Sequence, residues 1–85
     1  MRPEDVREHL EMRPFEPIRL FMSDGATFDI PHPDMCIVSR SAVYVGIPDP
    51  KHPGVAVRVA HCALIHITRI EAVNGASRRG RRRRT

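Results

Sequence analysis

The residues with the clearest chemical potential are arginines that lie close together in the segment SRRGRRRRT. They are Arg78, Arg79, Arg81, Arg82, Arg83 and Arg84. Six guanidinium groups can each neutralise one phosphate, which would give a slope of about −5 in log K against log salt. No aromatic residue is interleaved, so the segment offers no base stacking, and its contact with RNA or another polyanion would not depend on sequence. An anionic membrane, an acidic protein patch and the absence of any dedicated role remain alternatives.

The positive net charge of the chain comes entirely from this segment. The 85 residues include 14 basic and 10 acidic ones, a balance of +4, but without the six arginines 8 basic residues face 10 acidic ones, a balance of −2. A chain of this length forms one small domain that buries roughly 60% of its unfolded surface, which excludes a large enzyme with a deep substrate cleft. We therefore predict a domain over residues 1–74 and a disordered arginine-rich tail over residues 75–85.

Histidines and cysteines are the other candidates for chemistry. His61, Cys62 and His66 are of the types that bind zinc, but on an extended strand Cys62 and His66 would lie about 13 Å apart. Cys36 and Cys62 lie in apolar segments, where the pKa of a thiol rises and the thiol becomes inert. We therefore predict no catalytic residue, no metal site and no cofactor, and we do not expect an enzyme. The cysteines are expected to be free thiols in a reducing cytoplasm.

A short helix is predicted at residues 3–12. Pro3 suits the first helical position, and Val6 and Leu10 share one face. Ten residues are marginal as an isolated helix, so this face is expected to pack on the rest of the domain.

A β-hairpin is predicted at residues 18–30, where apolar residues fall at every second position. A two-residue Asp24-Gly25 loop would place the apolar sets of the two strands on opposite faces. A three-residue loop, with Gly25 in the left-handed bulge position, instead pairs Leu20 with Phe28 and Ile18 with Ile30. The pattern therefore favours the longer loop.

The rest of the domain is predicted to be β-structure. Two short strands at 35–39 and 42–47 surround a turn at Arg40-Ser41, and the proline-rich stretch 48–54 is expected to be a surface loop. Another strand begins at Val55, residues 61–63 form a short turn, and the last strand ends at Val73. A helix and five or six short antiparallel strands are expected to make a small, closed or half-closed barrel.

A subunit contact is predicted from the apolar residues that this arrangement leaves unexplained. Phe21 lies on the polar face of its strand, and the strand at 42–47 is apolar on both faces. Phe21, Val43, Tyr44 and Val45 are therefore the predicted interface of a homo-oligomer. The alternative is that the chain is a monomer and that its N-terminal helix covers Phe21.

The order of elements resembles the Sm-like fold, and bacterial host-factor RNA chaperones are the most similar group. The likeness lies in IRLFMSDGATFDI (Ile18–Ile30) and VAHCALIHITRI (Val59–Ile70). It implies a small Sm-like or SH3-like barrel, RNA binding, and a ring closed by contacts between strands. The chain also resembles short uncharacterised bacterial proteins that share Pro-Phe-x-Pro, Asp-Gly and His-Pro, here Pro14 to Pro17, Asp24-Gly25 and His32-Pro33.

Departures from the Sm-like pattern affect its RNA pocket. The base-binding Asp and Asn of Sm proteins fall near Asp34 and Cys36, and the Tyr-Lys-His triplet of the host-factor type falls on Val59-Ala60-His61. The resemblance therefore leaves His61 as the one nucleic-acid-binding residue of that triplet, without a stacking platform or a lysine.

Two functions follow from these observations. The first is a cytoplasmic, oligomeric Sm-like barrel that binds RNA or another polyanion weakly through its arginine-rich tail. The second is a protein-interaction or assembly module without a nucleic-acid role. No membrane span is predicted, because the longest apolar run, residues 42–47, is far shorter than the roughly 20 residues that a span needs.

Overall fold

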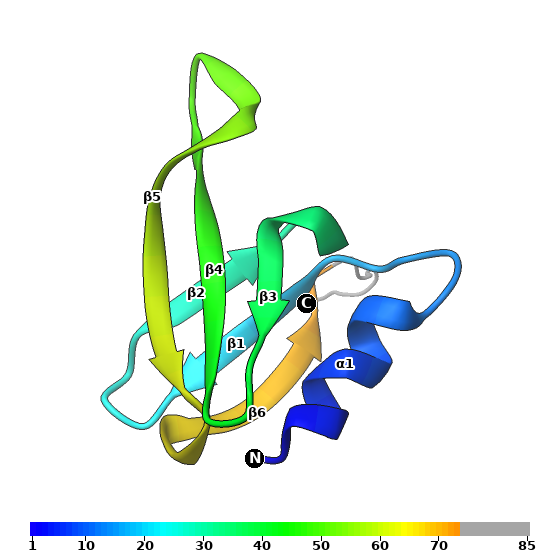
Figure 1. Ribbon diagram of the computed structural model, residues 1–85, viewed down its shortest axis with the longest axis vertical. Coiled ribbons are helices and arrows are strands. Elements are labelled where there is room, and N and C mark those ends of the chain that lie inside the picture. The colour runs from blue at the N-terminus through cyan, green and yellow to red at the C-terminus, as the bar shows by residue number, and fades with distance from the viewer. Residues whose placement is uncertain (74–85) are drawn as a thin grey trace, which may run out of the picture.

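The computed structural model describes residues 1–73, except for the side chain of Pro53. It is mainly β-structure and consists of one N-terminal helix and two antiparallel three-stranded sheets (Figure 1). Sheet A has the order β2-β1-β6 and is built from β1 (Ile18–Met22), β2 (Thr27–Ile30) and β6 (Ile67–Ala72). Sheet B has the order β3-β4-β5 and is built from β3 (Cys36–Val38), β4 (Ala42–Asp49) and β5 (His52–Ala63).

Two short 3-10 helices connect the sheets. Helix η1 (Pro33–Met35) joins β2 to β3, and helix η2 (Leu64–His66) joins β5 to β6. The chain thus crosses from sheet A to sheet B and back, so its first and last strands are neighbours in sheet A. The prediction of a mainly β domain with an N-terminal helix is confirmed, and residues 1–73 form two separate sheets rather than one closed sheet.

Helix α1 (Pro3–Glu11) forms where the sequence predicts it. The carboxylate of Asp5 accepts a hydrogen bond from the backbone N–H of Arg2 (3.1 Å), which caps the helix and lowers the pKa of Asp5. Val6 is fully buried and Leu10 packs against the core, so the apolar face of α1 is held by the sheets. Within residues 1–73, no helix combines the length and the apolar character needed to cross a membrane.

The hairpin of β1 and β2 has the predicted register. Leu20 lies opposite Phe28, and Ile18 lies opposite Ile30. Gly25 has φ = 92°, a left-handed conformation that costs a residue with a Cβ about 1–2 kcal/mol. Its N–H donates to the carbonyl of Met22 (3.0 Å). The three-residue loop is therefore confirmed.

The core lies where the apolar faces of the two sheets meet, and it includes two residues of the predicted interface. Val43 and Val45 are both 0% exposed and pack in the same cluster as Leu20 and Cys62. β4 is also the central strand of sheet B, between β3 and β5. The prediction that Val43 and Val45 form a subunit contact is therefore wrong, because their side chains fill the interior of the chain itself.

The hairpin of β4 and β5 is longer than the sequence predicts. Residues 48 and 49 continue β4, and β5 already begins at His52, so the predicted loop at 48–54 shrinks to a turn at Pro50-Lys51. The N–H of Lys51 donates to the carboxylate of Asp49 (2.9 Å), which closes this turn. The outer part of the hairpin extends beyond the rest of the molecule (Figure 1).

Candidate interaction site

The most exposed apolar strand is β5. It pairs with β4 on one side, and no strand within residues 1–73 pairs with its other side. The side chains of Val55, Val57 and Val59 are 57%, 61% and 61% exposed. Free strand edges present unpaired N–H and C=O groups to any other strand, and proteins usually shield them with charges, prolines or β-bulges. Among residues 53–60 of this edge, Arg58 is the only charged residue.

A shallow apolar groove lies on the outer face of sheet B. It has a volume of about 160 Å³ and is lined by Tyr44, Gly46 and Val59 together with residues of η1 and β3. Ile37, on the same face, is 67% exposed. A Cβ at Gly46 would lie 3.1 Å from Cε of Met35, so glycine at this position keeps the groove open. The groove and the free edge of β5 are adjacent because Val59 belongs to both.

His61 lies on the same outer face of sheet B. Its ring is tilted by 43° against the ring of Tyr44, with centroids 5.1 Å apart, and the two residues are opposite each other in the β4–β5 pair. Both side chains are exposed. Tyr44 thus has the accessible position predicted for a contact residue. The predicted nucleic-acid-binding arginines, Arg78 to Arg84, lie outside the described residues.

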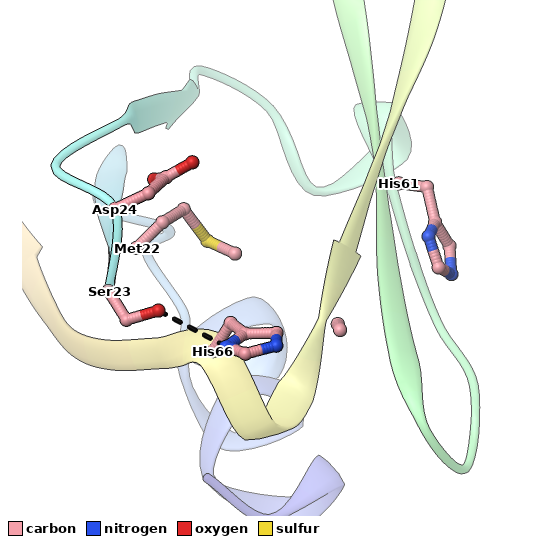
Figure 2. Close-up of a pocket in the computed structure, with 6 residues that line it drawn as sticks. Met22, Ser23, Asp24, His61 and His66 are labelled. Carbon is pink, nitrogen blue, oxygen red and sulfur yellow. Dashed lines mark hydrogen bonds between the residues drawn. The ribbon is translucent and has the colours of Figure 1, made fainter.

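A second cavity, of about 340 Å³ and with both polar and apolar lining residues, lies between the β1–β2 turn, the end of β5 and η2. Ser23 and His66 form a hydrogen bond between Oγ and Nδ1 (3.1 Å) in this cavity, and the ring of His61 points away from them (Figure 2). Asp24 accepts a hydrogen bond from the N–H of Ala26 (2.9 Å), so its carboxylate stabilises the β1–β2 turn. No carboxylate in the described part of the chain forms a hydrogen bond or ion pair with His66, so the serine–histidine pair lacks the acid of a hydrolytic triad.

The histidines and cysteines do not come together as metal ligands. His61 faces outward, whereas Cys62 is fully buried in the core. Residues 1–73 contain no group of three or more His, Cys, Asp or Glu side chains that could hold a metal ion.

Comparison with known proteins gives no relative. No family model, curated protein or solved structure matches this chain. The function is therefore inferred from the site itself.

Phe21 is held by a neighbour within the chain. It is half-buried, and the guanidinium of Arg69 lies 3.9 Å from the centroid of its ring. Arg69 also forms an ion pair with Glu71 (2.8 Å) along β6. The cation–π contact covers one face of the ring, so Phe21 offers less contact surface than the sequence suggests.

The two cysteines are free and buried. Burial and the proximity of Cys62 raise the pKa of Cys36 from 9.0 to about 11, and burial also raises the pKa of Cys62. Both thiols are therefore neutral and unreactive in the folded chain at neutral pH.

The raised pKa of Cys36 predicts a loss of stability at high pH. The unfolded chain releases this proton near pH 9, whereas the folded chain keeps it to about pH 11. The free energy of unfolding is therefore expected to fall by about 2 kcal/mol between pH 9 and pH 11. Urea unfolding of the reduced protein at intervals between pH 8 and pH 11 measures this fall. Cys36→Ala, as the control, should show a shallower decline, and equal declines would contradict the prediction.

Sequence reasoning missed the exposed valines of β5 as contact residues. The alternation of Val55, Val57 and Val59 predicts a strand with one apolar face, which would normally lie against the core. Val59 is instead exposed because it lies on the outer face of sheet B, opposite Gly46, whereas Val55 and Val57 are exposed where β5 pairs irregularly with β4. The sequence did contain an indication that β5 is an edge strand. Prolines occur at positions 48, 50 and 53, and within sheets proline is typical of edge strands and of bulges.

Proposed function

We propose that this chain is a protein-interaction and assembly module that binds another β-strand through the free edge of β5. The observation that carries the proposal is that Val55, Val57 and Val59 are each more than half exposed on a strand whose second side pairs with no strand of residues 1–73. Strand addition obtains affinity from backbone hydrogen bonds and selectivity from side-chain packing. β5 (His52–Ala63) offers both, except at Pro53, which has no backbone N–H to donate.

Charge also suits strand addition at this edge. Arg58 and the exposed ring of His61 are polar, but no acidic residue lies between His52 and Ala63. An incoming strand with alternating apolar residues would cover the valines without burying an unpaired carboxylate. The groove beside Val59 can accept a side chain of that strand, since Tyr44 and Gly46 form its walls.

A labelled peptide tests strand binding directly. A fluorescein-labelled peptide with the sequence of residues 52–63 is expected to bind the full-length chain saturably when followed by fluorescence anisotropy at nanomolar protein concentrations. Replacing Val55 and Val59 together with lysine should weaken binding at least tenfold, because two charges would enter an apolar contact. Ile65→Lys is the matched control, since Ile65 is 84% exposed in η2. Equal binding by all three proteins would contradict strand addition.

We propose polyanion binding as a second function, supported by the six arginines among residues 78–84. The rest of the chain carries a formal charge of −2, so its surface as a whole does not attract phosphate. The arginine-rich segment is therefore proposed to bind RNA or another polyanion without sequence preference, as an attachment to the assembly module.

We also propose an Sm-like barrel as the finer description of the fold. The order of elements supports it, as does the connection of the two sheets through η1 on one side and η2 on the other. A cytoplasmic location is proposed too, and two free buried thiols favour it because disulfides are rare in that compartment.

A further inference from the structure

We propose that the cavity between the β1–β2 turn, the end of β5 and η2 is a binding site for a small primary ammonium ion, which Asp24 and Ser23 recognise. This site is separate from the exposed valines of β5 and from the arginine-rich segment, so it goes beyond both proposed functions. Its volume of about 340 Å³ is at the lower end of the range for ligand pockets, about 300–1,000 Å³. At about 30 Å³ for a group the size of water, it holds a ligand of about ten non-hydrogen atoms.

The charge of the lining selects a cation. Among the described residues, the lining contains one carboxylate and no lysine or arginine; it consists of Met22, Ser23, Asp24, His61, Ala63 and His66. A phosphate or carboxylate ligand would meet the charge of Asp24 without a basic partner, whereas an ammonium ion pairs with it. The thioether of Met22 and the methyl group of Ala63 supply an apolar wall for a short alkyl chain. The cavity therefore suits an alkylammonium ligand, and the arginine-rich segment suits the opposite charge.

Two oxygen atoms in the cavity have lone pairs left for such a ligand. Oδ1 of Asp24 accepts the hydrogen bond from Ala26, and Oδ2 forms no hydrogen bond or ion pair with residues 1–73. Oγ of Ser23 is hydrogen-bonded to Nδ1 of His66 (3.1 Å). A hydroxyl oxygen has two lone pairs, so it keeps at least one for the ligand whichever of these two atoms donates. Asp24 and Ser23 are both exposed, so a ligand can reach the two oxygens from solvent.

The groups that recognise the ligand are held in place before it binds. The N–H of Ser23 donates to the carbonyl of His66 (2.7 Å), so the turn and η2 are joined by a backbone bond as well as by the side-chain bond drawn in Figure 2. The pairing of β1 with β6 shifts its register between Phe21 and Met22, and irregularities of this kind re-aim side chains beside functional sites. A site that is fixed in advance loses little conformational entropy on binding, which favours even a small ligand.

Titration of the full-length, ¹⁵N-labelled chain with n-pentylamine tests the site. At neutral pH and about 150 mM salt, which screens general attraction between charges, the amide signals of Ser23, Asp24 and His66 should shift saturably. A dissociation constant of about 1 mM is expected for a ligand of this size. The uncharged 1-pentanol should bind at least tenfold more weakly, because it cannot form the ion pair. Nα-acetyl-lysine methylamide distinguishes two sources of the ammonium group: comparable affinity assigns a lysine side chain of a peptide, and much weaker binding assigns a free amine.

Matched variants locate the binding at Asp24. Asp24→Asn removes the charge but keeps an oxygen that can accept from Ala26, so the turn should persist, and the affinity for n-pentylamine should fall at least tenfold. Asp49→Asn is the control, because Asp49 accepts from the N–H of Lys51 in the same way (2.9 Å) and lies outside the cavity; its affinity should equal that of the parent. Equal affinity of Asp24→Asn and the parent, equal binding of 1-pentanol, or the absence of any saturable shift would each overturn the proposal.

Discussion

A chain that ends at Gly75 is expected to lose the salt-dependent RNA binding that the full-length chain shows. Six phosphate contacts give a slope of about −5 in log K against log salt on a duplex and about −4 on a single strand, so affinity of the full-length chain for unstructured RNA should fall about 300-fold between 50 and 200 mM salt. Without Arg78 to Arg84, the remaining residues have a formal charge of −2. The truncated chain should therefore bind unstructured RNA weakly, with a slope near zero.

Filter binding across a salt series measures both quantities. Two full-length variants act as controls for the loss of chain length. Replacing the six arginines with lysine should keep affinity within a few-fold, because the contact is electrostatic, whereas six glutamines should reproduce the truncation. An unchanged affinity and slope after truncation would remove the polyanion function, and a strong loss in the lysine variant would point to a contact that requires guanidinium geometry.

Val45→Asp is expected to unfold the domain or to cost at least about 4 kcal/mol, because it places an unpaired carboxylate in the core. Val45 is 0% exposed and belongs to the cluster that joins the two sheets. A small domain has only about 5–15 kcal/mol of stability in total. The matched variant Val57→Asp, on the neighbouring strand, should change the free energy of unfolding by less than about 0.5 kcal/mol, since its side chain is in water.

Urea unfolding followed by circular dichroism, at concentrations low enough to give single chains, separates the two cases. If Val45→Asp leaves no folded state to measure, Val45→Ala provides a value, and about 2–3 kcal/mol is expected for the lost methyl groups and the cavity. A Val45→Ala chain as stable as the parent would mean that Val45 lies at a contact between subunits, as the sequence alone suggests. The opposite pattern at Val57 would place that residue in the core.

Local patterns in the sequence are sufficient to predict α1 and the β1–β2 hairpin. The hairpin register follows from alternation and from the need for a left-handed residue, since only the three-residue loop places Leu20 opposite Phe28 and leaves Gly25 at positive φ. The helix follows from Pro3 and the spacing of Val6 and Leu10. Both depend on contacts between residues that are close in the sequence.

The position of β4 and the exposure of β5 depend on contacts that local patterns do not contain. An apolar segment such as residues 42–47 is equally compatible with a subunit contact and with a central, buried strand. The strand order β3-β4-β5 shows that it is a central strand. The exposure of Val55 and Val57 depends on how far a hairpin extends past its neighbouring strands. Alternation of apolar and polar residues indicates a β-strand, but it does not indicate whether the apolar side chains pack against other residues.

The tilted ring pair of Tyr44 and His61 also places an intrinsic fluorophore on the outer face of sheet B. The chain contains one tyrosine and no tryptophan, so its near-ultraviolet emission comes almost entirely from one phenol, which lies on the outer face of sheet B beside the groove. A molecule that covers this face changes the solvent and the imidazole around that phenol. Quenching of native emission can therefore follow occupancy of the face without any label, and a probe that attaches elsewhere on the surface leaves the emission unchanged.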